Sequence, residues 1–266
     1  MKKRVLASLA ALYLMAPISG MAQDKKPDEP PKSPHTFTGN LNFVSEYRYR
    51  GISQTNFRPA IQGGFDYSHE SGFYLGTWAS NINWLSDAGA SASMEWDFYG
   101  GYKGAIGDYS YDVGGLYYYY PGKYPAGFTN PNTFELYAAG TWKWFTLKYS
   151  YGVTNTFGFI DSKGGGYLDL SGTYELGEGF IATAHVGHQL IPASSPNNRT
   201  KSACSYSDWK LGVTKDYVGL TWGLAYVGTN AKGDPGPPPE CYRNSLAAGD
   251  KDLGKGTVVL SVGKTF

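Results

Sequence analysis

The run at residues 37–50, FTGNLNFVSEYRYR, alternates between apolar and polar residues and decides the fold. Side chains of a strand point alternately to its two faces, so this run predicts a strand with one apolar and one charged face. Tyr47 and Tyr49 are then expected on the apolar face. The run is about fourteen residues long, whereas a soluble strand has roughly 5–6 and a tilted membrane-crossing strand roughly 9–11. Its length therefore favours a strand that spans a membrane.

The same alternation recurs as far as Phe266 and gives about twelve candidate strands. Only residues 72–84 are ambiguous, because large apolar side chains fall at both odd-numbered and even-numbered positions there. Tight links between candidate strands alternate with longer ones, the tight links being residues 68–72, 104–108, 143–144, 177–179 and 215–216. Short turns at one rim and long loops at the other are typical of outer-membrane barrels, and an open sheet edge is too costly in hydrocarbon. The sequence thus predicts an all-β fold, a closed antiparallel transmembrane barrel of about twelve strands, with short periplasmic turns and longer extracellular loops.

The composition agrees with β structure. The chain has 266 residues, of which 41% are hydrophobic and 16% aromatic, with 36 Gly and 23 Tyr. A mean hydropathy of −0.37, without an internal run near ~18 apolar residues, excludes a bundle of membrane helices. The formal charge of +1 gives no reason to expect nucleic acid as a partner.

The first residues read as an export signal. A basic start, Lys2 to Arg4, precedes a short apolar run and small residues, which predicts a signal peptide at residues 1–22 with cleavage after Ala22. A membrane-anchor helix is the alternative, but the apolar run is too short to span a bilayer. Residues 23–36 are polar and rich in Pro, so we expect a flexible periplasmic spacer, or else a partner motif. Residues 37–266 are left for the barrel.

Several stretches carry a resemblance to a known family. They read SEYRYRGISQT at 45–55, RPAIQGGFDY at 58–67, SGFYLGTW at 71–78, AHVGHQ at 184–189, YSDWKLGV at 206–213 and VGKTF at 262–266. With them the chain resembles the TorF family of outer-membrane porins, also called Gcw_chp proteins. The resemblance implies a barrel in the outer membrane of a Gram-negative cell, with an undefined solute and without known catalytic residues.

The charged side chains, which alternate with the apolar ones along each strand, are expected to line a water-filled lumen. Its acids number nine and its bases five, with one histidine: Glu46, Asp66, Glu95, Asp97, Asp112, Glu135, Asp169, Glu175 and Asp208, then Arg48, Arg50, Lys103, Lys148 and Lys210, then His185. An excess of acid predicts a weak preference for cations. The alternative is that these charges pair across the lumen and hold it shut. The first hypothesis for function is thus a channel for passive diffusion of small hydrophilic solutes, with outer-membrane lipid as the other partner.

Two other functions compete with the channel. A membrane-embedded hydrolase would use His69 and Ser71, or His185 with Asp169 and Ser171, although we favour a lumenal hydrogen-bond network for the second set. A filled structural barrel would present its loops for adhesion. We expect a protein that is not an enzyme and that has neither a cofactor nor a metal.

The two cysteines lie in neighbouring long loops. Cys204 and Cys241 pass through an oxidising compartment on export, which predicts a disulfide between them rather than two free thiols.

Overall fold

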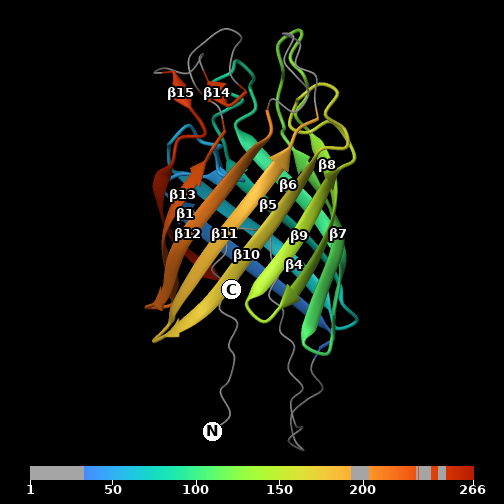
Figure 1. Ribbon diagram of the computed structural model, residues 1–266, viewed down its shortest axis with the longest axis vertical. Coiled ribbons are helices and arrows are strands. Elements are labelled where there is room, and N and C mark those ends of the chain that lie inside the picture. The colour runs from blue at the N-terminus through green and yellow to red at the C-terminus, as the bar shows by residue number, and fades with distance from the viewer. Residues whose placement is uncertain (1–32, 193–203, 232, 234–240, 245–249) are drawn as a thin grey trace, which may run out of the picture.

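Twelve antiparallel strands close into one barrel (Figure 1). The computed structural model describes residues 33–192, 204–231, 233, 241–244 and 250–266. Each barrel strand pairs with the next one along the chain, and β1 pairs with both β4 and β16, which closes the sheet. The strands are β1 (His35–Val44), β4 (Ala60–His69), β5 (Phe73–Asn81), β6 (Met94–Ile106), β7 (Tyr109–Tyr119), β8 (Thr133–Trp142), β9 (Phe145–Gly152), β10 (Gly166–Gly177), β11 (Phe180–Leu190), β12 (Tyr206–Tyr217), β13 (Leu220–Thr229) and β16 (Thr257–Thr265). The prediction of a closed twelve-stranded barrel is confirmed.

The connections alternate in length as expected. Links of two or three residues join the strands at the lower rim in Figure 1, and loops of many residues join them at the upper rim. The long loops carry two small ribbons, β2 (Arg48–Tyr49) with β3 (Ile52–Ser53) and β14 (Arg243–Asn244) with β15 (Lys251–Asp252). Within the described residues, no helix is long and apolar enough to span a bilayer.

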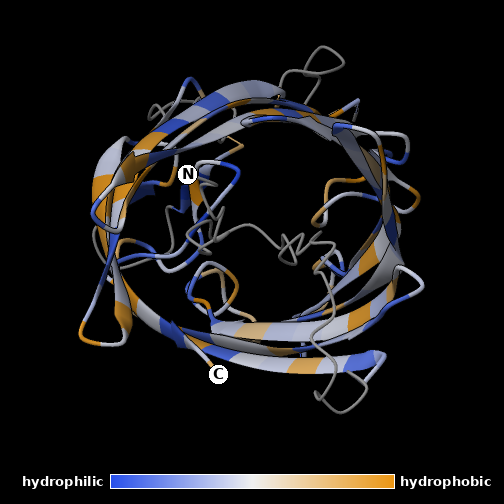
Figure 2. Cartoon of the chain, turned by 90° about the horizontal axis from the view of Figure 1, so that it is seen from below, coloured by the Kyte–Doolittle hydropathy of each residue, from blue (hydrophilic) through white to orange (hydrophobic). Residues whose placement is uncertain are grey.

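Outward side chains are mostly apolar along the barrel strands. In β7, Tyr109, Tyr111 and Val113 are exposed on the outside, whereas Leu116 and Tyr118 on the other parity are buried. The same alternation shows as successive hydrophobic and hydrophilic bands along the strands in Figure 2. An outer surface of this kind is stable against acyl chains and costly against water.

The first strand is shorter than its sequence pattern predicts. β1 ends at Val44, and the chain then turns into the barrel, so the prediction that Tyr47 and Tyr49 face outward is wrong. Tyr47 is instead buried, and Tyr49 packs edge-on against Tyr118 inside the lumen. The alternation of residues 45–50 continues that of the strand, but Arg50 has its partners Glu135 and Gln189 on distant strands, which the local pattern does not reveal.

Two smaller corrections concern boundaries. The barrel begins at His35 rather than residue 37, so residues 35–36 belong to β1 and not to the spacer. The rest of the predicted spacer up to residue 32, and the whole predicted signal peptide, lie outside the described residues. The tight link after β12 falls at Val218–Gly219, where both residues have positive φ, and not at residues 215–216. In the ambiguous segment, Phe73 and Leu75 face outward and Tyr74 faces inward.

Cys204 and Cys241 form a disulfide, with their Cα atoms 5.7 Å apart. It ties the loop between β11 and β12 to the loop between β13 and β16. Tyr242 strengthens the same junction, because its hydroxyl donates to the carbonyl oxygen of Cys204 at 2.5 Å.

Tyrosines on the inner wall lie across glycines of the neighbouring strands. The hydroxyl and ring of Tyr167 on β10 cover Gly187 on β11, and Tyr137 on β8 covers Gly114 on β7 in the same way. A Cβ atom at either glycine would overlap the tyrosine. These glycines therefore act sterically, since they let large side chains lie flat on the wall and leave room in the lumen.

A Gly187→Ala substitution is therefore expected to destabilise the barrel by about 1–3 kcal/mol, because Tyr167 must leave its position. Denaturant unfolding of the refolded protein measures the change. Gly140→Ala is the matched control, since no atom lies within 4 Å of a Cβ added at Gly140. Equal stability of both variants would contradict this steric account.

Candidate functional site: the barrel lumen

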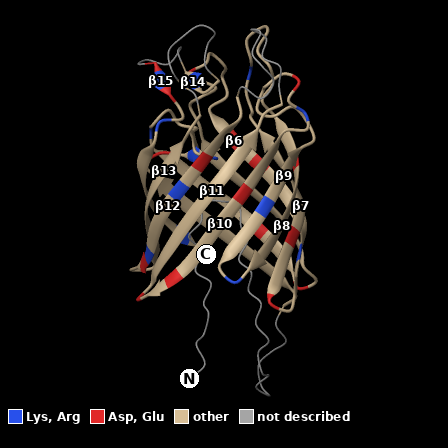
Figure 3. Cartoon of the chain, in the orientation of Figure 1, with Lys and Arg blue, Asp and Glu red and all other residues tan. Residues whose placement is uncertain are grey.

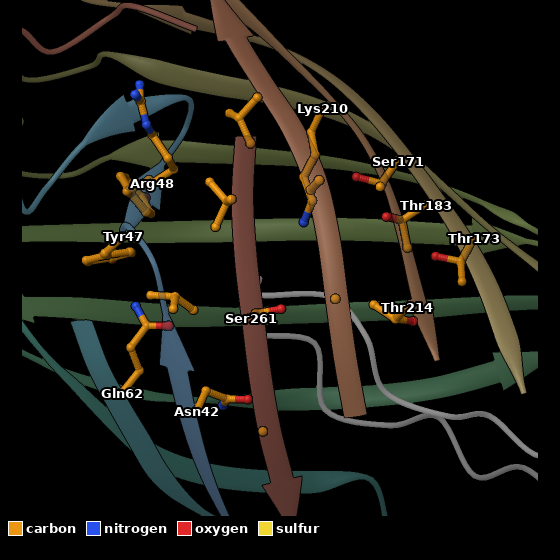
Figure 4. Close-up of a pocket in the computed structure, with 18 of the residues that line it drawn as sticks. Asn42, Tyr47, Arg48, Gln62, Ser171, Thr173, Thr183, Lys210, Thr214 and Ser261 are labelled. Carbon is orange, nitrogen blue, oxygen red and sulfur yellow. The ribbon is translucent and has the colours of Figure 1, made fainter. Parts of the chain in front are cut away.

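The lumen contains an elongated cavity of about 420 Å³. It is lined at the short-turn end by Thr38, Lys143 and Lys264, and at the other end by residues 46–51 and Tyr167. Most of the remaining lining side chains are hydroxyls, amides and charges on the inward parity of the strands, several of which Figure 4 labels. The cavity therefore extends along most of the height of the barrel, and most of the residues that line it are polar.

Residues 45–59, which we call the inserted segment, enter the lumen from the long-loop rim. They connect β1 to β4 and contain the β2–β3 ribbon. Tyr47 hydrogen-bonds Glu95 on β6, and Arg50 hydrogen-bonds Glu135 on β8 and Gln189 on β11. Because one short segment reaches three widely separated strands, it must lie across the inside of the barrel.

Arg50 is the main anchor of the inserted segment. Its guanidinium forms a two-pronged ion pair with Glu135, with N–O distances of 2.8 and 2.6 Å, and donates to Gln189 at 2.7 Å. It also lies 4.3 Å from the ring centroid of Tyr167. Tyr118 donates to the same carboxylate at 3.3 Å. Arg50 and its polar partners are all buried, so side chains fill the lumen at this level.

The chain conformation at the anchor is unusual. Arg50 has a φ of 45°, in the left-handed region that disfavours most side chains, and Gly51 follows at 78°. Burial would lower the pKa of Arg50, but the charge of Glu135 offsets that effect and holds the pKa well above its ordinary value. Arg50 therefore stays charged, and the ion pair compensates for the strained turn.

Glu46 and Arg48 pair with each other rather than with the barrel wall. Arg48 Nε lies 2.7 Å from Glu46 Oε1. The guanidinium also donates to the carbonyl oxygens of Gly51, Leu253 and Lys255. The two residues thus lie inside the barrel on the inserted segment, whereas the alternating pattern of residues 37–50 predicted that they lie on a barrel strand.

His185 on β11 connects two acids on its neighbouring strands. Its Nδ1 lies 2.7 Å from Asp169, and its Nε2 lies 2.7 Å from Asp208. Tyr167 donates to Asp208 at 2.8 Å, and Ser171 donates to Asp169 at 2.5 Å. The Ser171 hydroxyl also lies 3.4 Å from His185 Nδ1, but it gives its proton to the closer carboxylate, and both ring nitrogens of His185 already have carboxylate partners. This geometry is a hydrogen-bond network and not a nucleophile held by a base.

The other serine–histidine contact is at the rim. His69 Nδ1 lies 2.7 Å from the hydroxyl of Ser71, and both residues are on or beside an exposed short turn. In the described part of the chain no carboxylate hydrogen-bonds this histidine, and no cluster of three or more His, Cys, Asp or Glu side chains suits a metal ion.

Glu95 and Asp97 form an acidic pair on β6, and both are almost completely buried. Tyr47 donates to Glu95 at 2.9 Å, and burial raises the pKa of that tyrosine, which keeps its proton available. Among the described residues, no Lys, Arg or His forms an ion pair with either acid. This pair is the most deeply buried of the lumenal acids that have no ion-pair partner in the described part of the chain.

Asp66 and Asp112 accept hydrogen bonds from inward tyrosines on nearby strands. Tyr99 donates to Asp66 at 2.5 Å, and Tyr74 donates to Asp112 at 2.6 Å. Lys103 is directly opposite Asp112 in the β6–β7 register and lies 5.5 Å from the ring of Tyr74. These three charged residues are only partly buried.

Lysines occupy the wall that faces the acidic pair. Lys148 on β9 lies 4.0 Å from the ring of Tyr137, and Lys210 on β12 is in register with His185. Both line the cavity. Figure 3 shows the acidic and basic bands on β9, β10 and β12. Glu175, by contrast, is exposed near the short-turn end of β10 and does not line the cavity.

Sequence reasoning missed several polar residues that complete these networks, namely Gln62, Gln189 and Tyr167. Gln62 and Tyr167 both share the inward parity of charged neighbours, Asp66 for the first and Asp169 for the second. That shared parity was the available signal. An amide or a phenol is as capable of filling a lumen as a charge, but a count of charges alone overlooks it.

Glu135→Gln is expected to lower the free energy of unfolding by about 3–5 kcal/mol, because it leaves the buried Arg50 without a counter-charge. Denaturant unfolding measures the loss. The double variant Arg50→Gln and Glu135→Gln removes both charges and should recover part of it. A double variant less stable than Glu135→Gln would contradict the assignment of the loss to an unpaired guanidinium.

Known structures that resemble this fold include two porins and an outer-membrane channel. The NanC porin matches with a TM-score of 0.50 at 10% identity, covering 86% of this chain and 98% of that one. The KdgM porin, solved with disordered oligogalacturonate, has a TM-score of 0.49 at 8% identity, covering 87% and 98%. An outer-membrane channel from Pseudomonas putida F1 has a TM-score of 0.47 at 9% identity, covering 92% and 100%. At these identities the likeness to the NanC porin establishes the fold alone.

Sequence comparison identifies a family. A search of curated proteins finds no match. The family model described as "bacterial protein of unknown function (Gcw_chp)" matches residues 28–266, which include every strand of the barrel. The chain therefore belongs to the Gcw_chp family.

Proposed function

We propose that this chain is a TorF-type porin of a Gram-negative outer membrane, exported with cleavage after Ala22, and that it passes small hydrophilic solutes by passive diffusion. The observation that supports the proposal best is the contrast between its two surfaces. The barrel exposes large apolar side chains on its outside and encloses a polar cavity of about 420 Å³. Such a molecule suits a bilayer around it and water within it. The short turns then face the periplasm and the long loops the exterior.

We further infer a weak preference for cations. Arg50 pairs with Glu135, and Arg48 pairs with Glu46, so these four charges largely cancel. Glu95 and Asp97 have no such partner among the described residues, and Asp97 lines the cavity. Uncompensated carboxylates at a narrow level favour cations over anions.

Planar-bilayer recordings test the channel and its selectivity together. In a KCl gradient the purified protein should give small conductance steps and a reversal potential on the cation side. The double variant Glu95→Gln and Asp97→Asn should shift that potential towards zero, whereas Glu175→Gln, which is exposed outside the cavity, should not. Anion preference in the wild-type protein would contradict the inferred selectivity.

The filled level around Arg50 favours a second candidate, a structural barrel that presents loops for surface contact. Recordings of Glu135→Gln separate the two functions, because this variant releases the main anchor of the inserted segment. A channel should conduct in both proteins, and more strongly in the variant. Absence of current in both would support the filled barrel and overturn the porin.

A further inference from the structure

The acidic pair on β6 lies next to a buried amide that also lacks a full set of partners. In the described part of the chain, Asp97 Oδ1 and Gln62 Oε1 are buried and accept no hydrogen bond. Both residues are only 1% exposed. Buried oxygen acceptors nearly always have a donor, and an amide oxygen can accept two. Two such oxygens in one part of the lumen therefore point to a donor that binds there.

Strand register brings these oxygens to the same region. Gln62 on β4 is opposite Ser80 on β5, and Ser80 is opposite Glu95 on β6. Gln62 Nε2 donates to the Ser80 hydroxyl at 3.3 Å, so the amide lies over β5. Neighbouring strands are about 4.8 Å apart, which places the amide roughly one strand spacing from β6. Asp97 follows Glu95 by two residues and points to the same face.

Aromatic rings flank the acids on both sides. Asp97 is opposite Trp78 on β5 and opposite Tyr118 on β7. Tyr47 packs edge-on against Trp78, with ring centroids 5.4 Å apart. Carboxylates together with aromatic faces stabilise an organic cation better than either does alone.

We propose that Glu95, Asp97 and Gln62 form a binding site for the ammonium group of a small primary alkylammonium ion. An ammonium group carries one positive charge and three N–H donors, which match the uncompensated acids and the unpartnered oxygens. Its alkyl chain packs against Trp78 and Tyr118. Gln62, Trp78 and Asp97 all line the cavity, so the ion reaches the site through it. This inference deepens the proposed channel, since it names a class of solute.

Calorimetric titration of the detergent-solubilised protein with n-butylammonium chloride tests the site. Saturable binding of one ion per chain is expected at constant ionic strength. Asp97→Asn and Glu95→Gln should each weaken binding at least about tenfold, or about 1.4 kcal/mol. Asp66→Asn is the matched control, because Asp66 lines the same cavity but already accepts a hydrogen bond from Tyr99 at 2.5 Å. Binding to this control should match the wild type.

Comparison ligands define the chemistry of the site. The neutral alcohol n-butanol should not compete with butylammonium, and Trp78→Leu should weaken butylammonium more than it weakens K⁺. Saturable Mg²⁺ binding that displaces butylammonium would overturn the proposal in favour of a metal site. An equal loss in Asp66→Asn would also overturn it, since only the general charge of the cavity would then matter.

Binding and conduction are separate readouts. The titration needs only a folded barrel, which circular dichroism verifies for each variant, and Glu95→Gln decides the matter if Asp97→Asn does not fold. Absence of butylammonium binding to the folded wild-type protein would overturn the site. Absence of current with intact binding would instead overturn the channel.

Discussion

Closure of the backbone hydrogen-bond ladder is the constraint on which the rest of the structure depends. β1 pairs with β4 along one edge and with β16 along the other, so the barrel sheet has no free edge. Once the sheet is closed, each strand has one face outside and one face inside. Apolar side chains cover the outside, and the charges have no other place than the interior.

Charged side chains in the interior need partners of opposite charge, and the inserted segment supplies one of these partners. Arg50 neutralises Glu135 from across the lumen, while His185 lies between Asp169 and Asp208. Tyrosine hydroxyls satisfy the remaining acids on several strands. The barrel is thus stabilised by the groups that narrow it, and Glu95 and Asp97 are the most deeply buried of the lumenal acids that have no ion-pair partner among the described residues.

The barrel class, the strand number and the alternation of short and long links follow from the sequence, because a period of two survives in every strand except the ambiguous β5. The inserted segment does not follow from it. Residues 45–50 keep the period of a strand although they leave the sheet at Val44. A long-range contact, Arg50 with Glu135, decides their path, and no local pattern encodes such a contact. Length was the available warning, because a run of about fourteen residues exceeds the roughly 9–11 that a crossing requires.

The sequence predicts most of the charged residues that belong to the lumenal networks, but not which of them contact one another. Parity identifies which side chains point inward, but it does not say which of them meet. Ser171 looks like a nucleophile beside His185 in the sequence, and its hydroxyl instead donates to Asp169. The steric role of the glycines under Tyr137 and Tyr167 likewise becomes clear only when the strand register is known.

Sidedness is the central claim, and fluorescence quenching in lipid vesicles tests it most directly. A small fluorophore would be attached to single cysteines introduced at Leu211, which is exposed on the outside of β12, and at Ala225, which lines the cavity from β13. The native cysteines are joined in a disulfide and do not react. Brominated acyl chains should quench the probe at Leu211, and aqueous iodide the probe at Ala225. Iodide quenching of equal strength at both positions, without an effect of the brominated lipid, would contradict the account.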